Sequence, residues 1–181
     1  MKRVLIFGSN STLAKKIKSF LKNDYLVTEV AKKKINFSKK NSPSQIHKVL
    51  SKVNPDIVIN FAGVLGTNSD KYKDVYDVNF LPNWEIIKFY INNKTNKKVK
   101  IILIGSSSYK KGKANYMLYT SSKAALHNLY QAAKEKFENT YINIEIFHPP
   151  RFRSKLIKDL KKKGNFIKID TIAKTLFKKI K

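Results

Sequence analysis

Short apolar runs alternate along the chain with longer segments in which apolar residues recur three or four positions apart. The short runs are typical of buried strands, and the periodic segments are typical of amphipathic helices. Strands are expected at residues 3–7, 25–30, 34–37, 56–60, 100–104 and 142–147. Helices are expected at residues 13–21, 42–53, 72–92, 119–137 and 171–180. This alternation predicts an α/β fold with a parallel sheet and crossover helices.

Local signals refine three of these helices. Ser42 can cap the helix that it opens, and Pro43 suits the first turn, where no N–H is needed. The helix over 72–92 is expected to be interrupted near Pro82. In the last helix, apolar residues at helical spacing predict one buried face, formed by Ile172, Leu176 and Ile180.

Length and composition fit one globular domain over residues 1–181. A chain of 181 residues can bury a substantial core but is short for two domains. No apolar run approaches the roughly 20 residues that a membrane span needs, and the first apolar stretch is too short for a signal peptide. The absence of cysteine excludes disulfides and thiolate chemistry. We therefore expect a cytoplasmic protein.

The net charge of +26 comes almost entirely from lysines scattered through every segment. Arginine, which nucleic-acid surfaces use to fork onto bases and phosphates, occurs only at Arg3, Arg151 and Arg153. Charge alone predicts salt-sensitive, non-specific attraction to polyanions. A solvated lysine surface is the favoured interpretation, and nucleic acid is not the expected partner.

A turn that suits a phosphate group follows the first strand. Gly8-Ser9-Asn10-Ser11-Thr12-Leu13-Ala14 leads directly into a helix, so N–H groups and the positive helix end point across the sheet edge. Gly8 permits the tight turn, and Ala14 allows close packing of helix on strand. Ser11 or Thr12 takes the place of the middle glycine of dinucleotide-binding turns. The turn by itself fits an ordinary strand-to-helix connection with capping serines equally well.

Ser106, Tyr119 and Lys123 are the candidate catalytic residues. Tyr119 and Lys123 are four positions apart on an expected helix, so their side chains project from one face. A nearby ammonium lowers the pKa of a tyrosine and makes it a usable general acid or base. A serine hydroxyl can hydrogen-bond a substrate carbonyl while the tyrosine delivers or removes a proton. This chemistry fits hydride transfer, in which a nicotinamide carries the redox step.

The Tyr-x-x-x-Lys spacing alone is not specific in a chain so rich in lysine. It recurs at Tyr90/Lys94, Tyr109/Lys113 and Tyr130/Lys134. Tyr119/Lys123 differs in its context, because it lies thirteen positions after a serine that ends an apolar strand and it opens a helix of small residues. That context distinguishes this pair from the other three.

With these residues in place, the sequence resembles the short-chain dehydrogenase/reductase family over most of its length and in family order. Asn60-Phe61-Ala62-Gly63 is similar to the family's Asn-Asn-Ala-Gly segment, which stabilises the central sheet and borders the adenosine ribose. Asn79 stands where the family has the asparagine that completes its catalytic tetrad through a backbone kink and a water. The resemblance implies a three-layer, Rossmann-type, doubly wound parallel sheet, here shortened at the C-terminus.

The segment Pro149-Pro150-Arg151-Phe152-Arg153-Ser154 is similar to the family's Pro-Gly-x-x-x-Thr, which holds the nicotinamide carboxamide. Pro149 and Ser154 match that pattern, whereas Pro150 and, in the earlier segment, Phe61 depart from it. The resemblance implies an NAD(P)-dependent oxidoreductase that reduces a carbonyl or oxidises an alcohol. In this scheme Tyr119 transfers the proton, Lys123 lowers its pKa and binds the nicotinamide ribose, Ser106 orients the carbonyl and Asn79 supports the relay.

Residues after the second strand favour NADP over NAD. Glu29, near the end of that strand, would suit the free ribose hydroxyls of NAD, but Lys32 and the two lysines after it can neutralise a 2′-phosphate. Asn36 ends the expected third strand, where the family usually has an aspartate near the adenine amine. An amide can serve there.

Two shortened regions leave alternatives open. About four residues separate the second and third expected strands, so the usual helix is missing, as in the branch of the family that includes deoxysugar reductases. A sugar-nucleotide epimerase or deoxysugar reductase is therefore an alternative, although little chain follows Ser154 to bind a sugar nucleotide. A non-catalytic nucleotide- or nucleic-acid-binding module is another, which the charge and the missing glycine allow.

Two further expectations concern partners and metals. The helices over 72–92 and 119–137 resemble the pair that builds dimers and tetramers in the family, so a homo-oligomer is expected. His47, His127 and His148 lie far apart and match no metal-ligand spacing. We therefore expect no metal site and assign these histidines no role.

Overall fold

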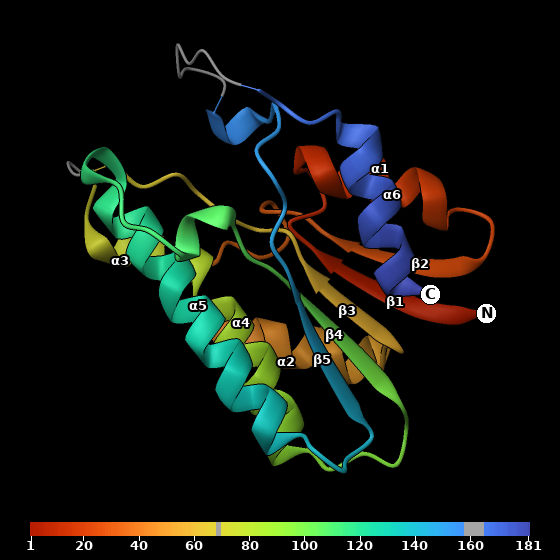
Figure 1. Cartoon of the computed structure of the whole chain (residues 1–181). Helices are drawn as coiled ribbons and strands as arrows, with labels where there is room; N and C mark the ends of the chain where they lie inside the picture. Colours follow the sequence, from red (N-terminus) through yellow and green to blue (C-terminus); the bar gives the residue numbers. More distant parts are fainter. Residues whose placement is uncertain (68–69, 158–164) are drawn as a thin grey trace.

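The computed structural model describes residues 1–67, 70–157 and 165–181. Within them, one parallel sheet has the strand order β2-β1-β3-β4-β5 (Figure 1). The strands are β1 (Lys2–Phe7), β2 (Tyr25–Val30), β3 (Ile57–Asn60), β4 (Val99–Ile104) and β5 (Ile142–Phe147). The helices are α1 (Thr12–Leu21), α2 (Ser42–Val53), α3 (Tyr72–Asn79), α4 (Leu81–Asn92), α5 (Met117–Lys136) and α6 (Ile169–Ile180). Three 3-10 turns are η1 (Ser107–Tyr109), η2 (Ala114–Tyr116) and η3 (Lys155–Ile157).

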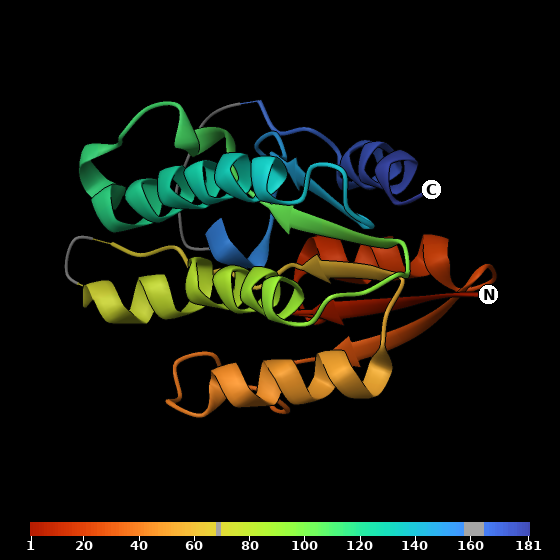
Figure 2. The ribbon, with the colours of Figure 1, turned by 90° about the horizontal axis from the view of Figure 1, so that it is seen from below.

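Helices cover both faces of the sheet because its strands are apolar on both sides. α1 and α6 lie on one face, and α2, α4 and α5 lie on the other (Figures 1 and 2). In β1, Val4 and Ile6 pack under α1 and α6, while Leu5 and Phe7 pack under α2, α4 and α5. These four side chains are fully buried. The three-layer, doubly wound Rossmann-type fold expected from the sequence is confirmed.

The expected strand over residues 34–37 is wrong. Lys34 and Ile35 instead donate backbone hydrogen bonds to the Ala31 carbonyl, at 2.9 and 3.1 Å, which forms a turn after β2. A parallel strand needs a crossover of about a dozen residues, and this segment follows β2 too closely. Its apolar side chains, Ile35 and Phe37, are still buried, but they pack in the core beside α2 rather than extending the sheet.

Of two expected details of helix ends, one is wrong and one is confirmed. Ser42 does not cap α2, because its hydroxyl donates to the Phe37 carbonyl at 3.1 Å and Asn41 is the capping residue. The expected interruption near Pro82 is confirmed: α3 ends at Asn79, Phe80 is the junction, and α4 begins at Leu81. At this break the Asn79 carbonyl accepts a hydrogen bond from the Asn83 side chain.

The C-terminal helix completes the sheet's first covering layer. Ile172, Leu176 and Ile180 are buried at 0–2 % exposure, as the helical spacing predicted. α6 packs beside α1, and both chain ends lie at the amino ends of the strands (Figure 1). No helix in the described part of the chain is long and apolar enough to cross a membrane.

Candidate active site

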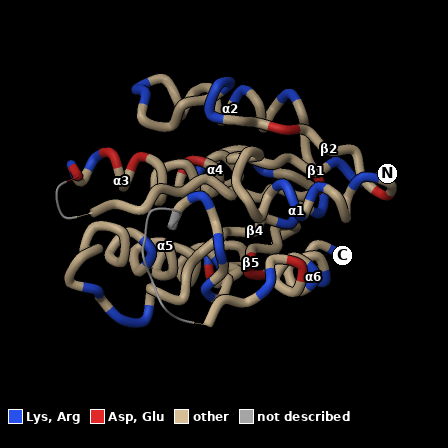
Figure 3. Tube along the Cα trace, turned by 90° about the horizontal axis from the view of Figure 1, so that it is seen from above, with Lys and Arg blue, Asp and Glu red and all other residues tan. Residues whose placement is uncertain are grey.

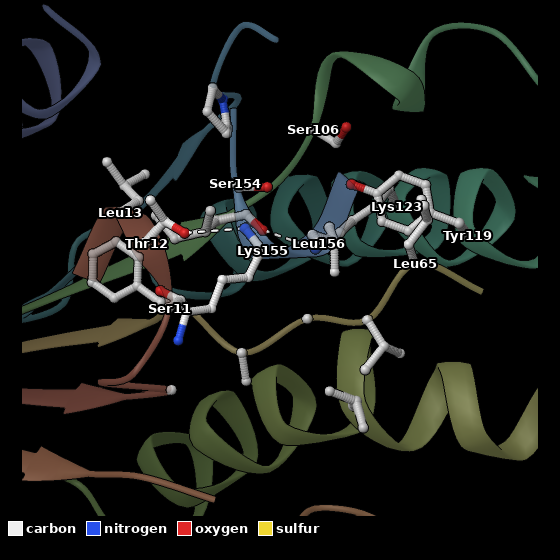
Figure 4. A pocket seen from close by; sticks show the side chains of 18 of the residues that line it. Ser11, Thr12, Leu13, Leu65, Ser106, Tyr119, Lys123, Ser154, Lys155 and Leu156 are labelled. Atoms are coloured by element: carbon white, nitrogen blue, oxygen red, sulfur yellow. Dashed lines mark hydrogen bonds between the residues drawn. The ribbon is translucent and has the colours of Figure 1, made fainter. Parts of the chain in front are cut away.

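A cavity of about 550 Å³ opens at the carboxyl ends of the strands. It lies where the strand order reverses, because the chain runs from β1 outward to β2 and then returns to place β3 on the other side of β1. Ligands of open α/β sheets bind in the crevice at this switch point. The turn after β1 forms one end of the cavity, and Ser106 and α5 form the other (Figure 4).

Gly8 brings the first turn into contact with the segment after β3. Its φ of +67° lies in the left-handed region, which favours glycine. A Cβ at this position would lie 2.4 Å from the backbone nitrogen of Ala62 and 2.8 Å from the carbonyl carbon of Phe61. Because glycine has no side chain, the turn after β1 can lie this close to the segment after β3 at the cavity floor.

The helix that follows the turn presents its positive end to the cavity. Ser11 caps α1 by accepting a hydrogen bond from Ala14 N at 3.2 Å. Thr12 and Leu13 begin the first turn, whose N–H groups have no acceptor within the helix. Thr12 also accepts a hydrogen bond from Lys155 N at 3.2 Å, which ties the segment after β5 across the cavity (Figure 4). An anionic group would be stabilised at this helix end.

The predicted catalytic residues Ser106, Tyr119 and Lys123 all line the other end of the cavity. The side chains of Ser106 and Tyr119 both point into the cavity (Figure 4). Ser106 Oγ accepts a hydrogen bond from Ser108 N at 3.1 Å, and this bond restrains the position of the Ser106 hydroxyl. Lys123 Nζ lies 6.0 Å from the centre of the Tyr119 ring and donates to the Ile104 carbonyl at 3.1 Å.

Burial governs the titration of both groups on α5. It raises the pKa of Tyr119, and the nearby Ser106 hydroxyl opposes this only in part. It lowers the pKa of Lys123 to about 8, because the ammonium is 4 % exposed and away from water. The expectation that Lys123 lowers the pKa of Tyr119 is therefore not met in this structure. The phenol stays protonated at neutral pH.

Asn79 lies behind the cavity wall rather than in it. Its side chain is fully buried and hydrogen-bonds to both backbone groups of Val64, at 2.9 and 3.1 Å. Asn79 Nδ2 also donates to Ser122 Oγ at 3.0 Å, and Ser122 donates to the Tyr119 carbonyl at 2.8 Å. Asn79 therefore holds α5 and the segment after β3 in place and makes no direct hydrogen bond to the phenol.

Asn83, which the sequence analysis missed, extends this support. Its Nδ2 donates to the Asn79 carbonyl at 3.0 Å, and its Oδ1 accepts from Asn60 Nδ2 at 3.0 Å. Asn60 Oδ1 in turn accepts from Ala62 N at 3.0 Å. This asparagine ladder, formed by Asn60, Asn79 and Asn83, is 0–2 % exposed and connects β3, the helix break and α5. The signal in the sequence was an asparagine placed next to the helix-breaking proline.

The β2 edge holds the residues that the sequence analysis assigned to the adenosine half of a dinucleotide. Lys32 and Asn36 both line the cavity. Asn36 Oδ1 accepts a hydrogen bond from Ser38 N at 3.2 Å. Glu29 is not among the lining residues, because its carboxylate pairs with Lys18 of α1 at 2.5 Å. The acidic residue expected to favour NAD is thus engaged elsewhere.

Most other predicted residues also reach the cavity. Those lining it are Gly8, Asn10, Ser11, Thr12, Leu13, Phe61, Ala62, Gly63, Pro149 and Ser154. Ser9 and Asn60 do not, since both are buried at 1–2 % exposure behind the wall. Direct cofactor contacts expected of Ser9 and Asn60 are therefore not supported by the geometry. The sequence analysis missed lining residues outside any motif, such as Leu65 after β3, Tyr116 in η2 and Leu156 in η3.

The structure also brings together two histidines to which the sequence analysis assigned no role. His127 Nδ1 and His148 Nε2 are 3.1 Å apart beside Ser106. No group of three or more potential metal ligands occurs among the described residues. Spacing could not reveal the pair, because α5 and the end of β5 meet only in the folded chain.

The fold and this site agree with comparisons to known proteins. A sequence model of the short chain dehydrogenase family matches residues 2–165, so the chain belongs to this family. No curated protein matches the chain in sequence.

Solved structures support the fold. A short chain dehydrogenase from Burkholderia cenocepacia in complex with NADP is similar with a TM-score of 0.83 and 14 % identity, covering 99 % of this chain and 84 % of that one. ElxO with NADP bound is similar with a TM-score of 0.81 and 20 % identity, covering 98 % of this chain and 90 % of that one. A 3-alpha-hydroxysteroid dehydrogenase from a Pseudomonas species, complexed with NADH, has a TM-score of 0.82 and 14 % identity. The match covers 97 % of this chain and 88 % of that one.

Proposed function

We propose that this short chain dehydrogenase is an NAD(P)H-dependent carbonyl reductase, which also catalyses the reverse oxidation of the alcohol. The observation that carries the proposal is the convergence of the Ser106 and Tyr119 hydroxyls in one cavity, with the buried Lys123 Nζ 6.0 Å from the Tyr119 ring centre. A substrate carbonyl oxygen placed between the two hydroxyls would accept hydrogen bonds from both. Such donors stabilise the negative charge that develops on oxygen during reduction.

The cavity fits a dinucleotide at its other end. Gly8 allows close approach of the backbone, and the first turn of α1 offers N–H groups to a pyrophosphate. Lys32 can pair with a 2′-phosphate while Glu29 is held by Lys18, which supports NADP as the preferred cofactor over NAD. Asn36, Phe61, Ala62 and Gly63 would line the adenosine side, and Pro149 and Ser154 the nicotinamide side. The bound cofactor would supply the hydride.

The side chains at the catalytic end handle the proton. Because burial raises the pKa of Tyr119, its neutral phenol can donate a proton to the alkoxide oxygen that forms. Lys123, whose pKa is lowered to about 8, carries a charge at neutral pH and supports the phenolate left behind. Asn79 is a positioning residue in this scheme, since it binds Ser122 and Val64 rather than the phenol. These protonation states favour reduction at neutral pH.

The substrate class is a small carbonyl compound. Leu65 and Leu156 lie near Tyr119 in the cavity (Figure 4), which Tyr116 also lines, and these side chains would contact the substrate's apolar part. Lysines and arginines lie on helices that cover both faces of the sheet (Figure 3). This dispersed charge supports a solvated surface and not a nucleic-acid groove. The homo-oligomer expected through the helices at 72–92 and 119–137 stays a prediction.

Replacing Tyr119 with phenylalanine tests the proposal. NADPH oxidation would be measured with a panel of aldehydes, ketones and one sugar-nucleotide ketone, and NADPH binding by fluorescence titration. Tyr119→Phe is expected to lower kcat by about a thousandfold or more, since the proton donor is lost, while the Kd for NADPH stays within about twofold. Tyr90→Phe, in α4, is the matched control and retains turnover, because Tyr90 has the same spacing to a lysine but does not line the cavity. Equal turnover in the wild type and Tyr119→Phe would refute the assignment.

A further inference from the structure

A half-buried histidine pair lies directly behind the catalytic serine. His148 follows β5 and His127 lies on α5, and their facing nitrogens, His148 Nε2 and His127 Nδ1, are 3.1 Å apart. The other nitrogen of His148, Nδ1, lies 3.1 Å from Ser106 N and 3.0 Å from Ser106 O. One imidazole thus bridges the second histidine and the backbone of the residue proposed to bind the substrate carbonyl.

The surroundings of the pair hold the rings in this arrangement. Tyr109, three residues after Ser106, packs on both rings, with centroids 4.0 Å from His148 and 4.2 Å from His127. Tyr109 N also donates to the Ser106 carbonyl at 3.2 Å. A Cβ on residue 105 would lie 2.4 Å from His148 Nδ1, so Gly105 is what lets the ring approach the end of β4.

The hydrogen-bonding capacity of a neutral imidazole matches these contacts. Neutral His148 has one donor and one acceptor nitrogen. With Nδ1 as the acceptor, Ser106 N–H is paired and Nε2–H donates to His127. In the other tautomer Nδ1–H donates to the Ser106 carbonyl, and His127 donates to Nε2. The first tautomer alone pairs the Ser106 N–H, so it is the form in which His148 holds both Ser106 and His127.

A proton added to His148 breaks this match. An imidazolium has two donors and no acceptor, so it can bond the Ser106 carbonyl but not the Ser106 N–H. Burial lowers the pKa of His148 below its ordinary value, and the charges of His127, Lys123 and Lys110 add to that, although the Ser106 carbonyl opposes it. These are the charged groups that face His148 from α5 and from the residues after β4. At neutral pH His148 is therefore uncharged.

We propose that His148 and His127 form a hydrogen-bonded pair that positions Ser106 for the reaction, and that a proton taken up by the pair releases Ser106 from that position. The pair is a positioning element and donates nothing to the substrate itself. Its effect on turnover rests on the proposed function, whereas its effect on the backbone of Ser106 does not. The consequence is a loss of activity on the acid side that belongs to His148 and not to Tyr119 or Lys123.

Nuclear magnetic resonance tests the pair without relying on turnover. The chain has three histidines, so their imidazole signals can be assigned by single replacements. We expect the amide signal of Ser106 to shift with pH at the same midpoint as His148, below about 6.5. His148→Asn should abolish that shift, because Asn places an amide group near the site of Nδ1 and does not titrate. His127→Asn should raise the midpoint of His148, since a charge that lowers it is removed.

The control for these spectra is His47→Asn. His47 pairs with Glu85 between α2 and α4, with its Nε2 3.0 Å from the Glu85 carboxylate, and is not hydrogen-bonded to Ser106. It should leave the titrations of His148 and of the Ser106 amide unchanged. A Ser106 amide that does not follow His148, or a His148 midpoint unaffected by His127→Asn, would overturn the proposal.

Kinetics give the second readout. In the wild type kcat for reduction should fall as the pH drops through the His148 midpoint, and His148→Asn should remain active with a flatter acid limb. His148→Leu should lower kcat about tenfold at neutral pH without changing the KM for NADPH, because only Ser106 is misplaced. An unchanged kcat in His148→Leu, or the same acid limb in His148→Asn, counts against the inference. If the wild type showed no turnover, only the proposed function would be refuted. The spectra would still test whether the histidine pair positions Ser106.

Discussion

At the catalytic end of the cavity, side chains hydrogen-bond to one another, whereas at the nucleotide end backbone atoms and apolar side chains form most of the walls. The asparagine ladder, Ser122, Ser106 and the histidine pair belong to the first end. The bare turn at Gly8 and the buried Ile35 and Phe37 belong to the second. The first end is held by specific polar pairs, and the second by the close approach of backbone segments.

This difference predicts how each end responds to change. A buried polar network fails when one partner is lost, because the remaining donors and acceptors stay unpaired in a medium without water. A wall formed by closely packed backbone is disrupted when a side chain is added to it, because no space is left for the added atoms. Removing a polar group should therefore damage the catalytic end, and adding a methyl group should damage the nucleotide end.

The largest effect is expected from Gly8→Ala. A Cβ placed 2.4 Å from Ala62 N, at a φ of +67°, forces β1 and β3 apart at the cavity floor. We expect the free energy of unfolding to drop by about 4 kcal/mol, measured by urea denaturation, with NADPH binding lost. Gly112→Ala is the control, because nothing lies within 4 Å of the Cβ it would add. If the two variants were equally stable, the close approach at Gly8 would not limit the fold.

Asn83→Leu tests the catalytic end in the same way. Leucine is close to asparagine in size but leaves the Asn60 amide and the Asn79 carbonyl without their partner. Leaving these groups unpaired should lower the free energy of unfolding by about 3 kcal/mol and reduce kcat, since Asn79 supports α5. Asn93→Leu removes a similar bond, from Asn93 Nδ2 to the Phe89 carbonyl, at an exposed site. That control should lose less than about 1 kcal/mol, and an equal loss would count against the ladder.

Lys123→Met should separate stability from activity at the catalytic end. Burial lowers the pKa of Lys123 from 10.5 to about 8, and each pKa unit is about 1.4 kcal/mol, so holding the charge at pH 7 costs about 3 kcal/mol. Methionine removes that cost but also the bond to the Ile104 carbonyl, about 1 kcal/mol. We expect the variant to be about 2 kcal/mol more stable at pH 7 and to lose turnover.

The pH dependence of this gain has a definite sign. The folded protein releases the Lys123 proton near pH 8, whereas the unfolded chain holds it up to 10.5. The stability of the wild type therefore rises relative to Lys123→Met between these two values and is lowest below them. Urea denaturation at three pH values across this window would measure it. Lys134→Met, at an exposed position on the same helix, should show no such trend, and a trend there would contradict the explanation.

How far the sequence could predict the molecule also differs between the two ends. Tyr119, Lys123 and Ser106 were predictable because a helical turn and a strand end fix where their side chains point. The alternating apolar runs likewise predicted the sheet and its covering helices. The role of Asn83 and the pairing of His127 with His148 were not predictable, because each depends on contacts between elements far apart in the chain.

At the nucleotide end the error had a different cause. The apolar pattern of residues 34–37 looked like a strand, and its side chains are indeed buried at Ile35 and Phe37. Periodicity reports burial but not pairing, and the short connection from β2 decides against a strand. Glu29 was interpreted as a candidate ribose ligand because the sequence does not show that Lys18 forms an ion pair with it.

The smallest effect is expected from Lys32→Gln, which probes the one cationic contact proposed at the nucleotide end. Lys32 lines the cavity and Glu29 does not, so the ammonium can pair with a 2′-phosphate without a competing carboxylate. Losing one charged hydrogen bond to phosphate should weaken NADPH binding about tenfold and leave NADH within about twofold. Lys33→Gln is the control, because its exposed side chain does not line the cavity. Fluorescence titration of both cofactors measures the ratio, and an equal weakening of NADPH and NADH would show that the lysine acts through general charge, with cofactor choice set elsewhere on this edge.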